Sequence, residues 1–308
     1  MTRVTNLMHQ QVLLNAFLDT QSKYAKTEEQ ISTGKVGDQF KDMAPDTGVL
    51  MSAKRTQAQT IAYEDTAKSL SQQLSLQDLH LNAIADSTKQ LRQTLTEAVA
   101  NDAGITVMEQ LEGVFTQAVA MLNSKVDGRY IYGGTRTDTA PVNVSTIDDL
   151  QAAASIASVF ENNSTKASVK IDAGETIEYG FLASDIATDL FQSIKDIADY
   201  NDGPNGPFST PLTDVQRQFL ESEIGDVINA YEGINLQVAQ NGLKQNSVDA
   251  ALERHETAKS VLAEFISNIE DVDLAEAVTQ LNSLEVASQA SAQVLSDVNQ
   301  LSLLNFLE

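Results

Sequence analysis

A seven-residue repeat runs through the C-terminal stretch of the chain, from Leu274 to the end. Two interleaved series share this spacing: Leu274, Leu281, Ser288 and Leu295, and Ala277, Leu284, Ser291 and Val298. From Ala275 onward the stretch contains no Pro, Gly, Lys or Arg. These features predict a long helix with one narrow stripe, as in a coiled-coil seam. Because so thin a stripe does not stabilise a helix by itself, the segment requires partner helices.

Acidic residues mark the start of this helix. Asp271 and Asp273 lie where an N-cap is expected, and Glu276 follows three residues after Asp273. Carboxylates at these positions satisfy the free amides of a first helical turn and interact favourably with its dipole. We therefore expect the helix to begin directly after them.

The N-terminal stretch, residues 4–33, predicts a second helix of the coiled-coil type. One column of its seam is expected to hold Leu7, Leu14, Gln21 and Glu28, and the other Gln10, Phe17, Tyr24 and Ile31. Gly34 and Gly37 end the pattern, and Pro45 with Gly48 predicts irregular chain up to Val49. The last 40 residues contain no Lys or Arg, so the two ends of the chain are electrostatically suited to pair. Such exposed charges bias the register of the two helices more than they stabilise their pairing.

Composition narrows the classes of protein that the chain can belong to. Ten Phe, seven Tyr and no Trp favour thin bundles over a thick globular core. A net charge of −23 excludes nucleic-acid binding, because no basic patch is present to neutralise phosphates, and the absence of Cys excludes disulfides and thiolate metal sites. The first residues are polar and amphipathic and no long apolar run follows, so we expect neither a cleaved signal peptide nor membrane insertion.

The middle of the chain indicates a helical bundle with an insertion. Residues 49–100 predict one helix, and 107–126 an antiparallel partner. A short helix is expected at 147–160 and a β-hairpin at 167–179. A further helix follows around residues 186–197 and ends at the turn that starts with Asp202-Gly203. Residues 215–269 then form a long helical region with Asn241-Gly242 as its one potential break.

The predicted fold is mainly α, a long antiparallel bundle or coiled coil formed by the N- and C-terminal parts, with a small α+β insertion in the middle. Its expected parts are an assembly helix and loop (1–48), the helical bundle (49–130 and 183–270), the insertion (131–182) and a second assembly helix (271–308).

The sequence contains no recognisable catalytic, cofactor or metal motif. His9, His80 and His255 are far apart and lack a second ligand at a spacing such as H-E-x-x-H. The run from Gly133 to Arg136 lacks the Gly-Lys-Ser/Thr of a phosphate-binding loop and favours a simple bend. We therefore expect no enzyme, no cofactor and no metal site.

Both ends also resemble a known family. The N-terminal residues concerned are Asn6, Met8, Gln10, Gln11, Gln21, Lys23, Ala25, Lys26, Glu29, Gln30 and 32–35, and the C-terminal ones are 271–277 and 301–307, together with the bend at 130–141. They resemble the bacterial flagellin superfamily, and in particular its hook-associated members, which join the hook to the filament. The run from Phe40 to Asp46 departs from the family pattern.

This resemblance implies an axial subunit of the flagellum that is exported unfolded through the flagellar type III apparatus. It further implies terminal helices that order on assembly, with self-association, flagellin, the hook-side junction protein and an export chaperone as partners. The assembly interface is then expected at the apolar seam positions: Leu7, Leu14, Phe17, Tyr24, Ile31, Leu274, Leu281, Leu284, Leu295, Val298, Leu301 and Leu304.

Three alternatives stay open at this point. A filament flagellin shares the terminal helices, although the Gln10-Gln11 start and the Asn305-Phe306-Leu307 ending favour a junction protein. A glycan-binding module or a hydrolase-like activity in residues 136–182 has no positive signal in the sequence.

Overall fold

The computed structural model describes residues 2–37 and 46–307, and the side chains of Met8, 11–37 and 46–298. The predicted loop at 38–45, including most of the run that departs from the family pattern, lies outside the described residues. The chain forms two compact units. Unit 1 comprises residues 1–59 and 257–308, and unit 2 comprises residues 60–256.

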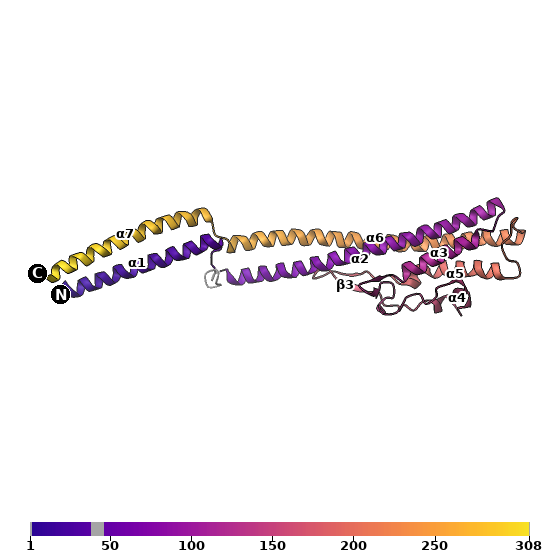
Figure 1. Ribbon diagram of the computed structural model, residues 1–308, viewed down its shortest axis with the longest axis horizontal. Helices are drawn as coiled ribbons and strands as arrows, with labels where there is room; N and C mark the ends of the chain where they lie inside the picture. The colour runs from indigo at the N-terminus through magenta and orange to yellow at the C-terminus, as the bar shows by residue number, and fades with distance from the viewer. Residues whose placement is uncertain (1, 38–45, 308) are drawn as a thin grey trace. The chain divides into compact units, whose positions relative to one another are not determined.

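Two terminal helices make up most of unit 1. Helix α1 spans Thr2–Thr33 and helix α7 spans Leu274–Leu307. Figure 1 shows them side by side, and an antiparallel bridge between Lys35 and Asp271 joins the end of one to the start of the other. The first turns of α2 and the last turns of α6 complete the unit.

The heptad prediction for α7 is confirmed from Ala277 onward. Between residues 277 and 298, the partly or fully buried side chains are Ala277, Leu281, Leu284, Ser288, Ser291, Leu295 and Val298, and every side chain between them is exposed. The spacing alternates four and three residues, which is the seam of a coiled coil. Leu274, the first member of one predicted series, is instead half exposed.

In α1, one of the two predicted seam columns is wrong by one residue. Phe17, Tyr24 and Ile31 are partly buried as expected, whereas Leu14, Gln21 and Glu28 are exposed. The second column consists of Leu13, Thr20 and Thr27. The hydroxyl groups of Thr20 and Thr27 donate to the carbonyls of Ala16 and Lys23, four residues earlier, so these threonines enter the seam without an unsatisfied polar group.

Two long helices form the frame of unit 2. Helix α2 spans Thr47–Asn101 and helix α6 spans Asp214–Glu270, so both long helical predictions are confirmed. The potential break at Asn241-Gly242 does not interrupt α6. Asn241 is buried, and its amide nitrogen donates to the carbonyl of Leu74 in α2 at 2.9 Å, so it links the two helices.

Helix α3, Val107–Leu122, is shorter than predicted. Two strands follow it, β1 (Lys125–Val126) and β2 (Arg129–Tyr130), which pair antiparallel. The turn residues Asp127 and Gly128 have positive φ of 50° and 78°, typical of a tight hairpin turn. The helix stops because the side chain of Asn123 forms two hydrogen bonds with the backbone of Val142, at 3.0 Å each.

The region 131–182 also differs from its prediction. The single helix expected at 147–160 is α4 (Ile147–Ala152) followed by a 3₁₀ turn, η2 (Ile156–Val159), because Ser155 caps a new start. The predicted β-hairpin is confirmed as β3 (Ser168–Lys170) paired with β4 (Thr176–Glu178).

Residues of this region pack into the core of unit 2. Phe160 stacks on Phe191 of helix α5 (Ala183–Asp202), which also contacts Phe115 of α3. The buried side chains that share this core with α2, α3, α5 and α6 are Tyr132, Val142, Val144, Leu150, Ile156, Val159 and Phe181. The predicted boundaries of the insertion remain a prediction, but its apolar residues fill one core together with the helices.

Candidate assembly surface

The end of α1 and the start of α7 are joined by backbone hydrogen bonds in both directions. The amide of Val36 donates to the carbonyl of Glu270 at 2.8 Å, and the amide of Val272 donates to the carbonyl of Gly34 at 3.0 Å. Gly34 has a positive φ of 71°, the left-handed conformation that ends many helices and that glycine adopts without strain. This glycine therefore turns the chain so that the strand-like contact with residues 270–272 forms.

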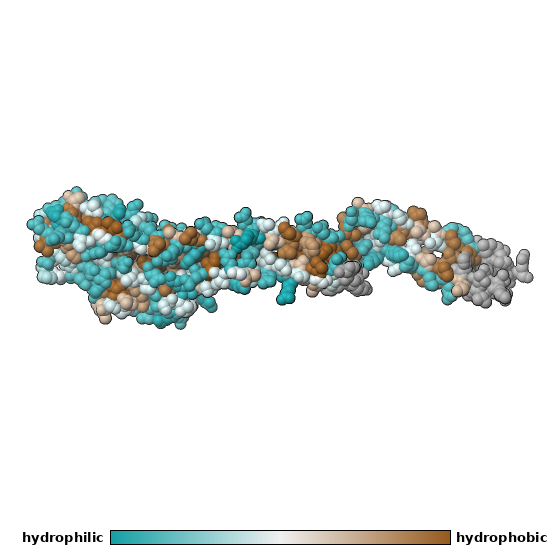
Figure 2. Space-filling view, turned by 180° about the vertical axis from the view of Figure 1, so that it is seen from behind, coloured by the Kyte–Doolittle hydropathy of each residue, from teal (hydrophilic) through white to brown (hydrophobic). Residues whose placement is uncertain are grey.

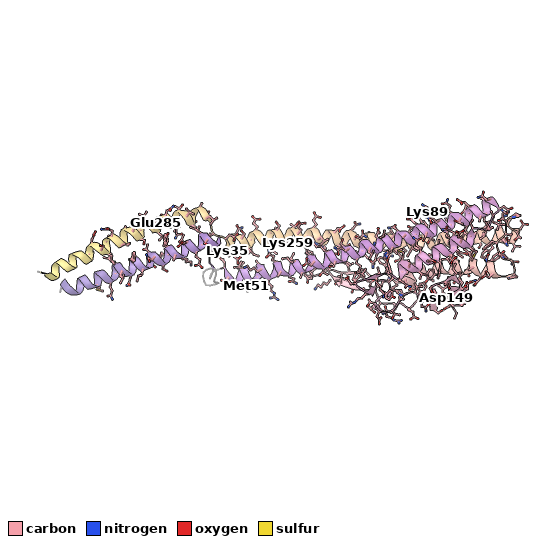
Figure 3. The ribbon with its side chains drawn as sticks, viewed as in Figure 1. Lys35, Met51, Lys89, Asp149, Lys259 and Glu285 are labelled. Atoms are coloured by element: carbon pink, nitrogen blue, oxygen red, sulfur yellow. The ribbon has the colours of Figure 1, made fainter. Side chains whose placement is uncertain are left out.

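Ion pairs surround this contact. Lys35, which Figure 3 labels, has its Nζ 2.5 Å from Asp271 Oδ1 and 3.7 Å from Glu270 Oε2. Lys54 of α2 also pairs with Glu270. The hydrogen bond to Asp271 raises the pKa of Lys35, and the hydrogen bond from Lys35 lowers the pKa of Asp271. Because Lys35 and Asp271 are both about half exposed, water weakens their ion pair. The pair therefore specifies the register of α1 on α7 more than it stabilises the fold. We call residues 34–36 and 270–272 with Lys54 the junction clamp.

The two predicted capping acids have different roles. Asp273 is the N-cap of α7, since its carboxylate accepts hydrogen bonds from the amides of Ala275 and Glu276 at 2.9 and 3.2 Å. Asp271 instead pairs with Lys35 and accepts a hydrogen bond from Ser267. The helix start predicted from these acids is confirmed, and the clamp uses the carboxylate that is not needed for capping.

The outside of unit 1 carries exposed apolar side chains away from the seam. Met8 is 68% exposed and Val286 is 67% exposed, and Figure 2 shows hydrophobic residues along this surface. The residues that we define as the outer face of unit 1 are Met8, Val12, Leu14, Leu18, Leu274, Val278, Val286 and Val294. Scattered single apolar residues are ordinary on protein surfaces, and these eight are candidates for contact with another subunit because they all lie on two neighbouring helices.

The predicted interface residues fall into three groups. Phe17, Tyr24, Ile31, Leu281, Leu284, Leu295 and Val298 are partly buried in the seam between α1 and α7. Leu14 and Leu274 lie on the outer face. The side chains of Leu7, Leu301 and Leu304 lie outside the described part of the chain. The role of the whole set in assembly stays a prediction.

Sequence reasoning missed the rest of the outer face and the junction clamp. The signal for the outer face was present, because Met8, Val12 and Leu18 are apolar residues outside both heptad columns. The clamp has no comparable signal, since Lys35 and Asp271 are far apart in the sequence and each fits a solvated surface equally well.

In residues 2–37 and 46–307, no helix combines the length and apolarity that crossing a bilayer requires. Within the same ranges, no three His, Cys, Asp or Glu side chains gather as ligands for a metal ion.

The comparisons with known proteins agree on one class. Residues 224–307, which include most of α6 and all of α7, match the family described as the bacterial flagellin C-terminal helical region. The resemblance of the C-terminal end to the flagellin superfamily is therefore confirmed.

More particular relatives match over nearly the whole chain. The chain is similar to flagellar hook-associated protein 3 of Salmonella typhimurium, with 21% identity over 97% of both chains. Flagellar hook-associated protein 3 of Escherichia coli K12 is 22% identical over the same shares.

Solved structures show the same fold. The putative flagellar hook-associated protein of Vibrio parahaemolyticus has a TM-score of 0.61 at 17% identity, covering 76% of this chain and 99% of that one. The Xanthomonas campestris FlgL structure has a TM-score of 0.56 at 13% identity, covering 70% and 99%.

Proposed function

We propose that this protein is a structural subunit of the bacterial flagellum that joins the hook to the filament and polymerises through its terminal helices. The observation that carries this proposal is the similarity to hook-associated protein 3 over 97% of both chains. The role is structural, and the proposal includes no catalytic step.

The packing of unit 1 supports polymerisation through α1 and α7. Their shared seam contains Ser288, Ser291, Thr20 and Thr27 at positions where stable coiled coils have large apolar residues. The outer face is apolar and exposed at the same time. A helix pair with a weak seam and an apolar outside gains stability when neighbouring subunits cover it. Contacts of this kind between unlike surfaces repeat head to tail and build an open helical array.

Partners and location follow as parts of the same proposal. The subunit contacts further copies of itself, flagellin and the other junction protein on the hook side, and an export chaperone binds it before assembly. It is located in the extracellular flagellum and leaves the cell through the flagellar type III apparatus. Terminal helices that order on binding allow one surface to serve the chaperone first and the assembly afterwards.

A filament flagellin is the second candidate, because residues 224–307 match a family that is described by flagellin itself. The names of the relatives matched over nearly full length favour the junction protein. No observation favours a glycan-binding or hydrolytic role for residues 136–182.

Immunogold labelling of intact flagella tests the proposal. We expect gold only at the boundary between hook and filament. Label along the whole filament would instead support the flagellin alternative, and label over the general cell surface would contradict both.

A further inference from the structure

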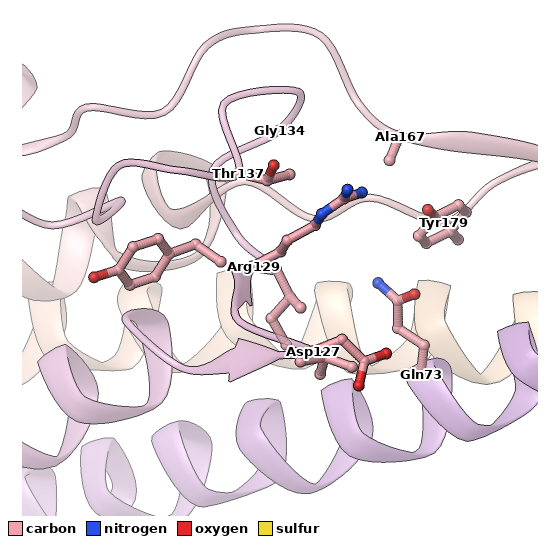
Figure 4. A pocket seen from close by; sticks show the side chains of 10 residues that line it. Gln73, Asp127, Arg129, Gly134, Thr137, Ala167 and Tyr179 are labelled. Atoms are coloured by element: carbon pink, nitrogen blue, oxygen red, sulfur yellow. The ribbon is translucent and has the colours of Figure 1, made fainter.

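A pocket of about 420 Å³ lies within unit 2, and none of its lining residues belongs to the assembly surface described above. The β1–β2 hairpin, the bend that follows it and the ends of β3 and β4 form its walls, and α2 contributes Gln73 (Figure 4). Its polar lining includes Gln73, Asp127, Arg129, Thr137 and Tyr179.

The backbone holds this pocket open before any partner binds. Gly134 has a positive φ of 68°, and a Cβ atom there would come within 2.3 Å of Asn163 Oδ1. The same oxygen accepts hydrogen bonds from the amides of Thr135 and Thr165, and the amide of Tyr130 donates to the carbonyl of Thr137. The wall is thus a hydrogen-bonded bend that only glycine allows, so the cavity is a preformed feature of the fold.

Arg129 extends into the pocket, into the space between Thr137 and Tyr179 (Figure 4). Three of the four other arginines of unit 2 bind carboxylates: Arg136 pairs with Glu161, Arg217 with Asp102 and Arg254 with Glu175. Arg129 forms no ion pair with any described carboxylate, although Asp127 lines the same cavity. Lys125, whose Nζ lies 4.4 Å from the centre of the Tyr130 ring, adds positive charge beside it.

We propose that this pocket receives an exposed Asp or Glu side chain from a second copy of the chain in the assembled array. The inference rests on the proposed function, because it requires copies that contact one another. A guanidinium group binds a carboxylate through two parallel hydrogen bonds, and Gln73, Thr137 and Tyr179 supply further polar groups around it.

Charge complementarity favours another copy as the occupant. Each chain carries 43 acidic and 20 basic residues, so neighbouring copies repel one another at most places where they meet. An acidic side chain of the next copy is attracted to a cation that lies in a concave site and has no partner within its own chain. Such complementary pairs fix the register of an interface.

Charge reversal at this position, Arg129→Glu, tests the inference in the full-length protein expressed in a strain that lacks it. We expect at least a tenfold loss of labelled hook–filament junctions, with the helical circular dichroism of the monomer unchanged. Arg129→Lys should retain part of the assembly, because it keeps the charge and loses the two-pronged geometry. Lys89→Glu is the matched control, since it makes the same charge change at an exposed position of α2 outside the pocket (Figure 3).

If Arg129→Glu lowers the helicity of the monomer, Arg129→Gln decides in the same assay, because it removes the charge without reversing it. Normal junctions with the reversed or neutralised side chain would overturn the inference while leaving the proposed function intact. If the unmodified protein itself were absent from junctions, the proposed function would fail first.

Selection for restored motility identifies the occupant. From the Arg129→Glu strain we expect second changes within the same gene that replace an exposed acid by Lys or Arg. Restoring changes found only in a different flagellar protein would show that the partner is not a second copy.

Discussion

Units 1 and 2 are both built from paired long helices, yet they bury very different amounts of side chain. In unit 2, the core contains aromatic clusters, such as Tyr200 stacked on Phe219 with ring centres 3.8 Å apart. Among the described side chains of α1 and α7, only Thr27 and Ala277 are fully buried. Because helix stability comes mostly from tertiary packing, we expect unit 2 to fold alone and the terminal helices to depend on contacts beyond their own chain.

The contrast between the two units is tested most strongly by a substitution in the core of unit 2, which should lower the stability of the monomer. Phe191→Ala removes a fully buried ring that contacts Phe115 and Phe160, and we expect a loss of about 3–5 kcal/mol in the free energy of unfolding. Chemical denaturation of the monomer, followed by circular dichroism, measures it. The matched variant Phe17→Ala in α1 should leave the main unfolding transition where it is. Equal losses in both variants would mean that the two units are not energetically distinct.

A charge in the seam of α7 should instead impair assembly and leave the stability of unit 2 unchanged. Leu295→Asp places a carboxylate in the partly buried stripe between α1 and α7, at a local cost of about 2–3 kcal/mol. We expect junction assembly to fail while the unfolding of unit 2 remains unchanged. The control Gln289→Asp adds the same charge to an exposed position of the same helix. Motility restored by the Leu295→Asp protein would show that α7 is not the polymerising element.

The two terminal helices also show what periodicity can and cannot predict. In α7, both seam columns were predicted, because the heptad is unbroken from Ala277 to Val298. In α1, two columns fit beside Phe17, Tyr24 and Ile31 with the same four-and-three spacing, and the choice of Leu14 over Leu13 was wrong. Periodicity alone does not distinguish the two columns, since the outcome depends on which side of α1 faces α7.

Long-range contacts account for most of the other differences between the structure and the predictions from the sequence. Helix α3 ends early because Asn123 binds Val142, and the clamp forms because Lys35 meets Asp271, and neither contact has a local signal. The Arg129 pocket is of the same kind, because it requires three separate segments to come together. Helix positions and the start of α7 were predictable, because capping residues and helix-breaking glycines act within a few residues.

Ionisation of a buried carboxylate makes the stability of unit 2 depend on pH. Glu223 is almost fully buried and one of its oxygens has no hydrogen-bond partner. Burial, and then the nearby charges of Asp196 and Asp226, raise its pKa to about 7. The unfolded chain releases this proton at its ordinary, lower pKa, so stability is full below that value and is lost as the pH rises through about 7.

Glu223→Gln keeps the neutral form at every pH. We expect it to raise the free energy of unfolding by about 1–3 kcal/mol at pH 8 and to change little at pH 4, measured by denaturation at both values. Glu221→Gln, at an exposed position of the same helix, should show no such difference. Equal effects of Glu223→Gln at both pH values would mean that the carboxylate is not held neutral by the fold.

The smallest effect is expected at the junction clamp. Lys35→Met removes the pair with Asp271 but keeps the backbone hydrogen bonds of Val36 and Val272, so unit 2 should unfold at an unchanged denaturant concentration. Amide hydrogen exchange should become faster only around residues 30–36 and 270–277, because the pair specifies register at a half-exposed site.

The pH dependence of that exchange sharpens this last prediction. Asp271 has a lowered pKa, so its contribution is present above the ordinary carboxylate pKa and is lost as the pH falls through the lowered value. Lys35 has a raised pKa, so its contribution is present below the ordinary lysine pKa and is lost only as the pH rises through the raised value. The unmodified protein should therefore exchange more slowly than Lys35→Met at neutral pH, and the two should converge in strong acid. At pH 6 the carboxylate of Asp271 is ionised in both proteins, so convergence already there would show that its pair with Lys35 contributes nothing and that the backbone hydrogen bonds alone set the register of α1 on α7.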